Sequence, residues 1–197
     1  MTVYIVDLES IQTRYTCEWK TYLPKLIHAT GHNVGVISGP DDLPNNTTPG
    51  MFLNFSATNI YKAAQVEKIS RLFSDNKIKD GDYFLFTDAW HPGVINLKYM
   101  SELLGVKIKI GGCWHSGSYD PQDGLGRLIG DKPWVRNAER SFFHAFDHNY
   151  FATDFHIDML CWNLLSTSGI FSQQLIDSGK IIRTGWPMEY MGNILAP

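Results

Sequence analysis

The chain has 197 residues, of which 44% are hydrophobic and 19% are charged. This length suffices for one well-buried core and falls short of two ordinary domains, and the composition excludes an intrinsically disordered protein. Its 17 basic and 20 acidic side chains give a net charge of −3, so strong binding of duplex DNA through a general electrostatic field is not expected.

Cysteine usage and the first residues indicate the cellular compartment. Cys17, Cys113 and Cys161 lie far apart and form no CxxC pair, which favours a reducing environment. The opening stretch MTVYIVDLES lacks the basic start, apolar core and cleavage site of a signal peptide. No run approaches the roughly 18 apolar residues of a membrane span. We therefore expect a cytoplasmic protein without a membrane span.

Hydrophobic spacing predicts alternating strands and helices from the start of the chain. The first helical pattern ends at Gly31, a residue suited to a helix C-terminus. The run Tyr83–Phe86 is wholly apolar, which is typical of a central strand. In chain order, the first half predicts a strand over 3–6, a helix over 14–30, strands over 33–37 and 51–55, a helix over 60–73 and a strand over 83–86.

The second half of the chain continues this alternation. Pro92 and Gly93 introduce a helix, and Gly105 caps it. The predicted elements are a helix over 93–104, a strand over 106–110, a helix over 135–146, a strand over 150–153, helices over 155–165 and 171–177, and a strand over 181–183. Such alternation favours a parallel sheet covered on both faces. We expect an α/β protein, a three-layer Rossmann-like domain with a mainly parallel sheet.

Reactive side chains gather in loops that follow predicted strands. The loops are DLESIQTRYT after the first strand, TDAWHPG after Phe86, GGCWHSGSYDPQD after Ile110 and ATDFH after Phe151. In an open parallel α/β sheet, the ligand crevice lies beyond the carboxyl ends of the strands. We therefore expect the strand ends at Asp7, Thr87, Gly111 and Thr153 to share one edge of the sheet. The glycines of the third loop would let its backbone approach a ligand.

Ordinary structural roles compete with this interpretation. Asp88 is also placed to cap a helix, and Asp120 and Asp123 also fit Asx turns. Trp90 and Trp114 fit either packing at a rim or a surface that stacks on a sugar or base. A basic group interleaved with acidic residues favours a solvated helix face, and it comprises Arg127, Lys132, Arg136 and Arg140 with Asp131 and Glu139.

Several signatures of bound metals, cofactors and nucleophiles are missing from the sequence. No HxH, HExxH or CxxC occurs, so no metal is predicted, although the loops contain suitable ligand types. The first loop has no glycine and no GxxxxGK[ST] segment occurs, so no dinucleotide or P-loop cofactor is predicted. Ser116 lies in HSGSY rather than in GxSxG, which argues against a serine nucleophile.

The order of these loops resembles a known family. The resemblance covers 3–187 and depends on Arg14-Tyr15-Thr16, TDAWHPG, HSGSYDPQD, YFATDFH and the ending KIIRTGWPMEYMGN. Together they resemble the N-terminal Rossmann-like domain of a GT-B glycosyltransferase of the kind found in phages and bacteria. Many members of that family carry a glycine-rich loop after the first strand, and this chain has DLESIQTRYT there.

The resemblance implies the acceptor-binding half of an enzyme that moves a sugar from a nucleotide-sugar donor to a hydroxyl acceptor. Residues 1–187 would form this domain, and 188–197 would start a linker to a second domain that holds most of the donor site. The chain alone would then be inactive, as a truncated piece or as a natural single-domain relative. The implied catalytic candidates are Asp88, His115 and His91. The implied acceptor-binding residues are Arg14, Trp90, Trp114, Ser116, Tyr119, Asp120 and Asp123.

Two alternatives from other classes stay open. The same aromatic loops suit a module that holds a sugar or nucleotide without turnover. A small α/β hydrolase or metal-dependent enzyme, complete in itself, is the other alternative. The acceptor is equally open, since a DNA base, a lipid, a protein side chain or a glycan would each fit aromatic loops at strand ends.

Overall fold

The computed structural model describes residues 1–9, 15–44, 46–47 and 51–187, and these form an α/β fold around one parallel sheet. The described strands are β1 (Thr2–Val6), β2 (Asn33–Ile37), β3 (Tyr83–Phe86), β4 (Lys109–Trp114), β5 (His148–Phe151) and β6 (Ile181–Arg183). Their order in the sheet is β2-β1-β3-β4-β5-β6, and every pairing is parallel. The three-layer Rossmann-like expectation is confirmed.

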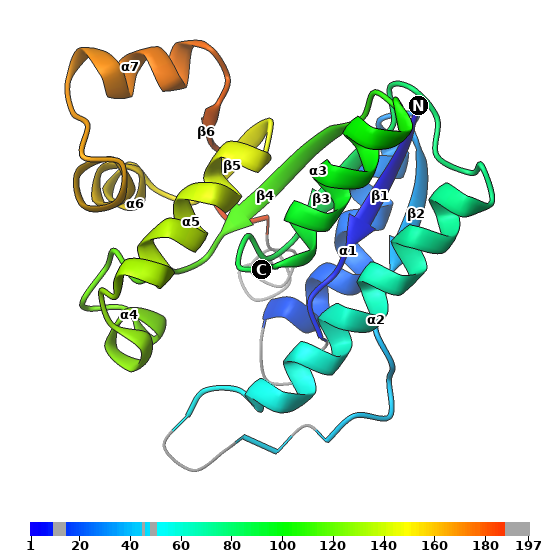
Figure 1. Cartoon of the computed structure of the whole chain (residues 1–197), viewed down its shortest axis with the longest axis horizontal. Helices are drawn as coiled ribbons and strands as arrows, with labels where there is room; N and C mark the ends of the chain where they lie inside the picture. The colour runs from blue at the N-terminus through cyan, green and yellow to red at the C-terminus, as the bar shows by residue number, and fades with distance from the viewer. Residues whose placement is uncertain (10–14, 45, 48–50, 188–197) are drawn as a thin grey trace, which may run out of the picture.

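Helices cover the two faces of the sheet unequally. The long helices are α1 (Tyr15–Ala29), α2 (Phe55–Ser74), α3 (Gly93–Leu104) and α5 (Pro133–Ala145), and the shorter ones are α4 (Gly124–Ile129), α6 (Asp154–Met159), the π-helix η1 (Leu160–Leu164) and α7 (Ile170–Asp177). In Figure 1, α2, α3 and α5 lie on one face, and α1 lies behind the strands. The direction of the connections explains the position of α1. Only the β1–α1–β2 connection moves toward the β2 edge of the sheet, whereas all later connections move toward the β6 edge. Because such crossovers are right-handed, α1 lies on the opposite face from the helices of the later connections.

Two hydrophobic cores reflect this unequal cover. Alternate residues of β3 point to opposite faces, so Phe84 and Phe86 are fully buried under α2, α3 and α5, whereas Tyr83 and Leu85 face the α1 side and are less buried. The large core also takes in the Phe142, Phe143 and Phe146 rings. The small core under α1 consists of Ile5, Trp19 and Leu23.

Among the predicted elements that differ from the structure are the strand over 51–55 and the strand over 106–110. The strand predicted over 51–55 is wrong, because Asn54 caps α2 by accepting a 3.1 Å hydrogen bond from the Ala57 amide, and the helix therefore begins at Phe55. The fourth strand was predicted to end at Ile110 but runs on to Trp114. Gly111 and Gly112, expected in a loop, thus lie in β4, where rings from neighbouring elements pack against the bare backbone.

The carboxyl ends of the strands lie on one edge of the sheet, as the parallel pairing requires. The strand-end residues Asp7, Thr87 and Thr153 follow β1, β3 and β5, as predicted. On β4 the end lies at Trp114, not at Gly111. The described elements extend from 2 to 183, and the predicted linker of 188–197 lies outside the described residues. None of the helices in the described ranges combines the length and apolar character needed to cross a bilayer.

The close approach at Gly112 predicts a specific loss of stability. A Cβ at this position would lie 2.5 to 2.7 Å from three ring carbons of Phe146, which is fully buried and cannot move aside freely. Gly112→Ala should therefore destabilise the fold by about 1–3 kcal/mol, the usual cost of overpacking a core.

Urea unfolding measures this change, and Gly124→Ala is the matched control. At Gly124 the nearest atom to an added Cβ is a Phe52 ring carbon at 3.6 Å, an ordinary contact, and alanine favours the helix. We expect the control to match or exceed the parent in stability. Equal midpoints for the two variants would show that Gly112 is not required for packing.

Candidate functional site

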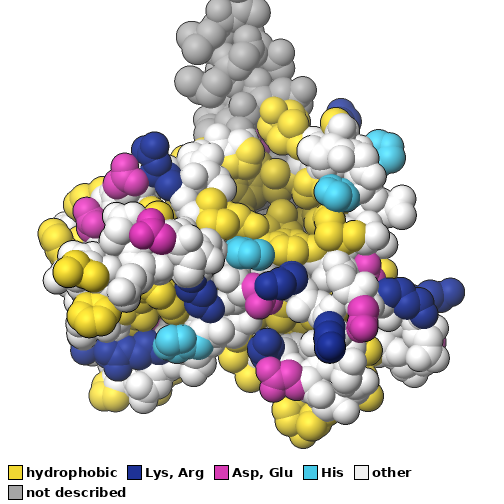
Figure 2. Space-filling model, turned by 90° about the horizontal axis from the view of Figure 1, so that it is seen from above, with side chains coloured by type: hydrophobic (Ala, Val, Ile, Leu, Met, Phe, Trp, Pro, Cys, Tyr) yellow, Lys and Arg dark blue, Asp and Glu magenta, His cyan; other side chains and the backbone are white. Residues whose placement is uncertain are grey.

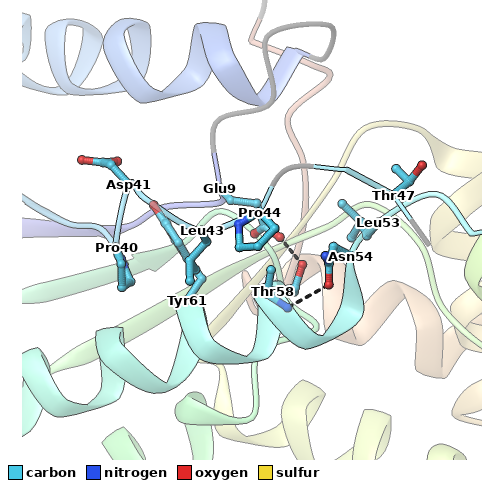
Figure 3. Close-up of a pocket in the computed structure, with 11 residues that line it drawn as sticks. Glu9, Pro40, Asp41, Leu43, Pro44, Thr47, Leu53, Asn54, Thr58 and Tyr61 are labelled. Carbon is cyan, nitrogen blue, oxygen red and sulfur yellow. Dashed lines mark hydrogen bonds between the residues drawn. The ribbon is translucent and has the colours of Figure 1, made fainter.

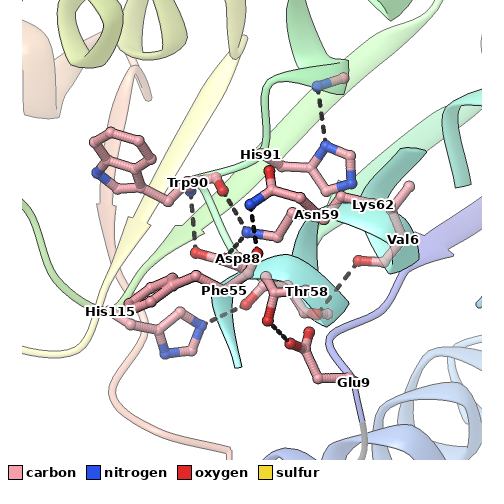
Figure 4. Close-up of polar contacts among 12 residues, drawn as sticks. Val6, Glu9, Phe55, Thr58, Asn59, Lys62, Asp88, Trp90, His91 and His115 are labelled. Carbon is pink, nitrogen blue, oxygen red and sulfur yellow. Dashed lines mark hydrogen bonds and ion pairs between the residues drawn. The ribbon is translucent and has the colours of Figure 1, made fainter. Parts of the chain in front are cut away.

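Five polar side chains meet where the strand order reverses, at the carboxyl ends of β1 and β3. Glu9 follows β1, Thr58 and Lys62 lie in the first turns of α2, Asp88 follows β3 and His115 follows β4 (Figure 4). We call these five residues the switch-point cluster. In an open parallel α/β sheet, the reversal of strand order opens a crevice because the neighbouring connections leave toward opposite faces.

An ion pair between α2 and the loop after β3 forms the centre of this cluster. The Lys62 ammonium donates to Asp88 Oδ2 at 2.7 Å and to the Trp90 carbonyl at 2.5 Å, and Asp88 Oδ1 accepts from the Trp90 amide at 3.0 Å. Burial opposes ionisation of Asp88, but the positive charge of Lys62, together with the hydrogen bonds from Lys62 and the Trp90 amide, outweighs it and lowers the pKa of the carboxyl below its usual value. The group is therefore a fixed carboxylate at neutral pH, and its side chain keeps 20% of its surface exposed.

The imidazole of His115 is held at both nitrogens. Its Nε2 donates to the Thr87 carbonyl, which can only accept, so Nδ1 accepts from the Tyr15 hydroxyl at 2.6 Å. Burial lowers the pKa of His115, against the opposing effect of the Asp88 charge, and the ring is neutral near pH 7. The indole of Trp186 stacks on it, with centroids 4.8 Å apart.

A second network lies beneath this cluster and contains His91. The Gly93 amide donates to His91 Nδ1 at 3.0 Å, so Nε2 carries the proton and donates to Gln65 Oε1 at 3.0 Å. Burial lowers the pKa of His91 to about 3. The side chain is 2% exposed and both nitrogens make hydrogen bonds that join the start of α3 to α2, which argues against the predicted role of His91 as a catalytic base.

Glu9 borders a small cavity beside the first turns of α2 (Figure 3). The Thr58 hydroxyl donates to Glu9 Oε1. The second carboxylate oxygen, Oε2, is shielded from solvent and meets no hydrogen-bond donor among the described residues. The cavity measures about 130 Å³ and is lined by Glu9, Pro40, Asp41, Leu43, Pro44, Thr47, Leu53, Asn54, Ala57, Thr58 and Tyr61.

The aromatic residues after β4 are mostly core residues. Trp114 is 1% exposed, stacks on Phe151 and donates from its indole nitrogen to Asn149 at 2.8 Å, so it offers no free face to an acceptor. Tyr119 is 5% exposed, and its hydroxyl hydrogen-bonds to His156 at 2.7 Å. The stacking role expected for these two rings is therefore corrected to packing.

Two polar residues of the segment after β4 have local structural roles, in a turn and in a helix cap. Asp120 accepts from the Gln122 amide at 2.8 Å, which is an Asx turn, and Asp123 caps α4 through the Leu125 amide at 2.7 Å. Ser116 follows His115 and is half-buried. Arg14 lies outside the described residues, so its expected acceptor contact stays a prediction.

Glu139 departs from the solvated helix face that the charge pattern predicted. Its carboxylate is fully buried and accepts from the amide and hydroxyl of Ser118, both at 2.6 Å, and from the Trp90 indole at 2.9 Å. Burial raises its pKa, although these hydrogen bonds act in the other direction. The contact fixes the half-buried Trp90 ring against α5. Trp90 lies two residues after Asp88 in the sequence.

An apolar hollow of about 510 Å³ lies on the α1 face of the sheet. None of the described residues that line it is Asp, Glu, Lys or Arg. Figure 2 shows a hollow lined by hydrophobic side chains on this side of the molecule. Trp19 and Trp186 belong both to its lining and to the rings around His115, so the hollow adjoins the switch-point cluster. The Trp19 indole also donates to the Pro187 carbonyl at 2.8 Å.

Sequence analysis placed Asp88 and His115 at one crevice but missed three members of the cluster. Lys62 lies in a helix that was predicted from its apolar positions alone, and Thr58 precedes the predicted start of that helix. Glu9 lies in the loop after the first strand, which was considered only for its lack of glycine. The spacing of Thr58 and Lys62, four residues apart on one helix face, is a usable signal. In the described part of the chain, no group of three His, Cys, Asp or Glu side chains is arranged to hold a metal ion.

Neither a scan against models of protein families nor a search of the curated proteins finds a match for this chain.

Burial of neutral His91 predicts loss of stability in acid. The unfolded residue takes up a proton near pH 6.5, whereas the folded residue stays neutral down to about pH 3. Its contribution to stability is therefore present above pH 6.5 and is lost as the pH falls, by about 1.4 kcal/mol per pH unit. His91→Gln should flatten the fall in unfolding free energy between pH 6 and pH 4.

The measurement is urea unfolding at a series of pH values, with exposed His28→Gln as the control. Glutamine can accept from the Gly93 amide and donate to Gln65, so the variant should fold, with some stability lost at pH 7. A pH dependence equal to that of the parent and of His28→Gln would contradict a buried neutral His91.

Proposed function

We propose that this domain is the acceptor-binding half of a GT-B glycosyltransferase. It transfers a sugar from a nucleotide-sugar donor to a hydroxyl group of an acceptor, and a second domain holds most of the donor site. The parallel sheet supports this proposal, since the ligand crevice of such a sheet lies at the reversal of strand order. The observation that carries the proposal is the convergence of Asp88, Lys62 and His115 at that reversal, from separate elements of the chain.

Asp88 is the base in this proposal. In an inverting transfer, the acceptor oxygen forms a bond to the anomeric carbon, the bond from that carbon to the nucleotide diphosphate breaks, and the hydroxyl proton passes to the base. Each carboxylate oxygen of Asp88 accepts one hydrogen bond from the protein and retains a lone pair. Lys62 keeps the group ionised and fixes its position, so the carboxylate is ready to accept the proton.

His115 has a positioning role rather than a basic one. Its Nε2 donates to the Thr87 carbonyl and its Nδ1 accepts from Tyr15, so neither nitrogen is free to remove a proton. It fixes the loop after β4 against the loop after β3, next to Asp88. The nearby rings of Trp90 and Trp186, half-buried and 40% exposed respectively, provide apolar faces for a sugar or another planar acceptor.

A non-catalytic binding module is the second candidate function. The protein contacts of Asp88 favour it, because Lys62 and the Trp90 amide already bond to both oxygens and lower the basicity of the carboxylate. A module of this kind would bind the acceptor with the same residues and would show no turnover in any assembly. Enzyme kinetics of an Asp88 variant separates the two functions.

Asp88→Asn should lower the transfer rate of the enzyme that contains both halves. The change keeps size and most hydrogen bonding but removes the base, and such a loss costs typically 10²–10⁴-fold in rate, about 3–5 kcal/mol of barrier. Release of nucleoside diphosphate in the presence of acceptor measures it. Asp177→Asn, an exposed change on α7, should leave the rate unchanged.

An Asp88→Asn rate within about twofold of the parent would contradict the assignment of the base, and the same result for His115→Gln would contradict its positioning role. Unfolding of either variant would assign the residue to loop structure instead.

The 197-residue chain by itself should show no sugar transfer, because the proposed donor site lies mostly elsewhere. Incubation with a panel of nucleotide sugars and assay of released nucleoside diphosphate, with and without a chelator, tests this expectation. Robust release by the chain alone would overturn the two-domain proposal. Release that a chelator abolishes would point instead to a metal-dependent enzyme complete in itself.

A further inference from the structure

We propose that the cavity over Glu9 is a subsite for the hydroxyl groups of a neutral polyol, such as a sugar ring. The inference deepens the proposed function and rests on it for one point, namely that this polyol is part of the acceptor. Binding of a polyol at Glu9 is otherwise independent of whether the domain takes part in catalysis.

The unpartnered oxygen of Glu9 is the first observation. Thr58 donates to Oε1, while Oε2 is shielded from solvent and meets no donor in the described ranges. A buried acceptor without a donor costs free energy, so such atoms in folded proteins call for an explanation. A ligand that brings its own O–H or N–H group into the cavity would satisfy this oxygen.

The chemistry of the cavity wall selects among possible donors. Its charged groups are the carboxylates of Glu9 and Asp41, of which Asp41 pairs with Lys20 at 3.0 Å, and its neutral polar groups are Thr47, Asn54, Thr58 and the Tyr61 oxygen, whose own proton is donated to Asp7 at 2.7 Å. No Lys or Arg is among the described residues of the wall. A phosphate or carboxylate ligand would therefore meet like charge, which disfavours the diphosphate of a nucleotide sugar here.

The cavity wall combines apolar and polar groups, which suits the C–H and O–H groups of a sugar ring. Leu43, Leu53 and Pro44 supply apolar contacts, and Figure 3 shows these side chains, Thr58 and Glu9 around the same space. The volume of about 130 Å³ exceeds that of a single water, roughly 30 Å³ in the liquid. It suits a small ring or part of one.

The position of the cavity connects it to the proposed base. Thr58 and Lys62 are four residues apart on α2 and so lie on the same side of the helix, one turn apart. Thr58 contacts Glu9, and Lys62 contacts Asp88. A polyol held by Glu9 would therefore lie next to the ion pair, with another part of the acceptor directed toward Asp88.

Nuclear magnetic resonance titration of the chain tests the subsite. The probes are D-glucose, D-galactose and myo-inositol, with inorganic phosphate and magnesium chloride as comparisons. We expect at least one polyol to shift the amide signals of Ala57 and Thr58, and the two salts to leave them unchanged. Glu9→Gln should weaken polyol binding at least tenfold, because it replaces one acceptor oxygen with an N–H donor.

The control variant is Glu67→Gln, the same chemical change on the exposed surface of α2. It should bind the polyol within twofold of the parent. The melting temperature of Glu9→Gln should equal or exceed that of the parent, since glutamine can still accept from Thr58 and the change removes the unpartnered carboxylate oxygen. A merely structural Glu9 would show the opposite, a lower melting temperature with polyol binding unchanged.

Three outcomes overturn the inference: no shift with any polyol, stronger binding of phosphate or magnesium than of polyols, or equal effects of the two variants. The proposed function fails separately. Polyol binding that depends on Glu9, without transfer in the assembled enzyme, retains the subsite and rejects the glycosyltransferase. Transfer that depends on Asp88 but is unaffected by Glu9→Gln retains the enzyme and rejects the subsite.

Discussion

The hydrogen bonds of one buried glutamine hold together the edge of the sheet at which β1 and β2 end. Gln65 is fully buried, and its amide group donates to the carbonyls of Asp7 and Ile37, both at 2.7 Å, while its oxygen accepts from His91. These bonds join the ends of β1 and β2 to α2 and to the start of α3. The Ile37 carbonyl also accepts from the Asp7 amide at 3.3 Å, so Gln65 adds a second donor there and supplies one to the Asp7 carbonyl just past the end of β1.

The position of α2 at this edge determines what the edge can bind. Gln65 fixes the middle of the helix, so its first turns lie over the carboxyl ends of β1 and β3. Thr58 then contacts Glu9, and Lys62 contacts Asp88. Glu9 and Asp88 lie in loops that are far apart in the sequence. The carboxylate of Asp7 is used structurally instead, because it accepts from Ser38 at 2.5 Å and from Tyr61, and burial raises its pKa.

The two faces of the sheet have different roles as a result of the crossover directions. The face under α2, α3 and α5 carries the large core, and Gly112 in β4 allows the Phe146 ring to pack closely there. The face under α1 has the small core, and beside it the apolar hollow. Trp19 and Trp186 line this hollow and also contact the His115 ring. The sheet itself separates the large core from the apolar hollow.

Sequence alone determined the α/β class, the parallel sheet and most elements, because hydrophobic periodicity and turn residues act over a few neighbouring residues. It also placed Asp88 and His115 at a common edge, since parallel strands share their carboxyl ends. Tertiary structure alone decided which polar groups are free. The burial of Trp114 and Glu139, the bonds at both nitrogens of His91 and the unpartnered oxygen of Glu9 depend on contacts between distant segments. Local pattern carries no information on such contacts, because a hydrogen bond or a buried surface is set by the partner that the fold brings near.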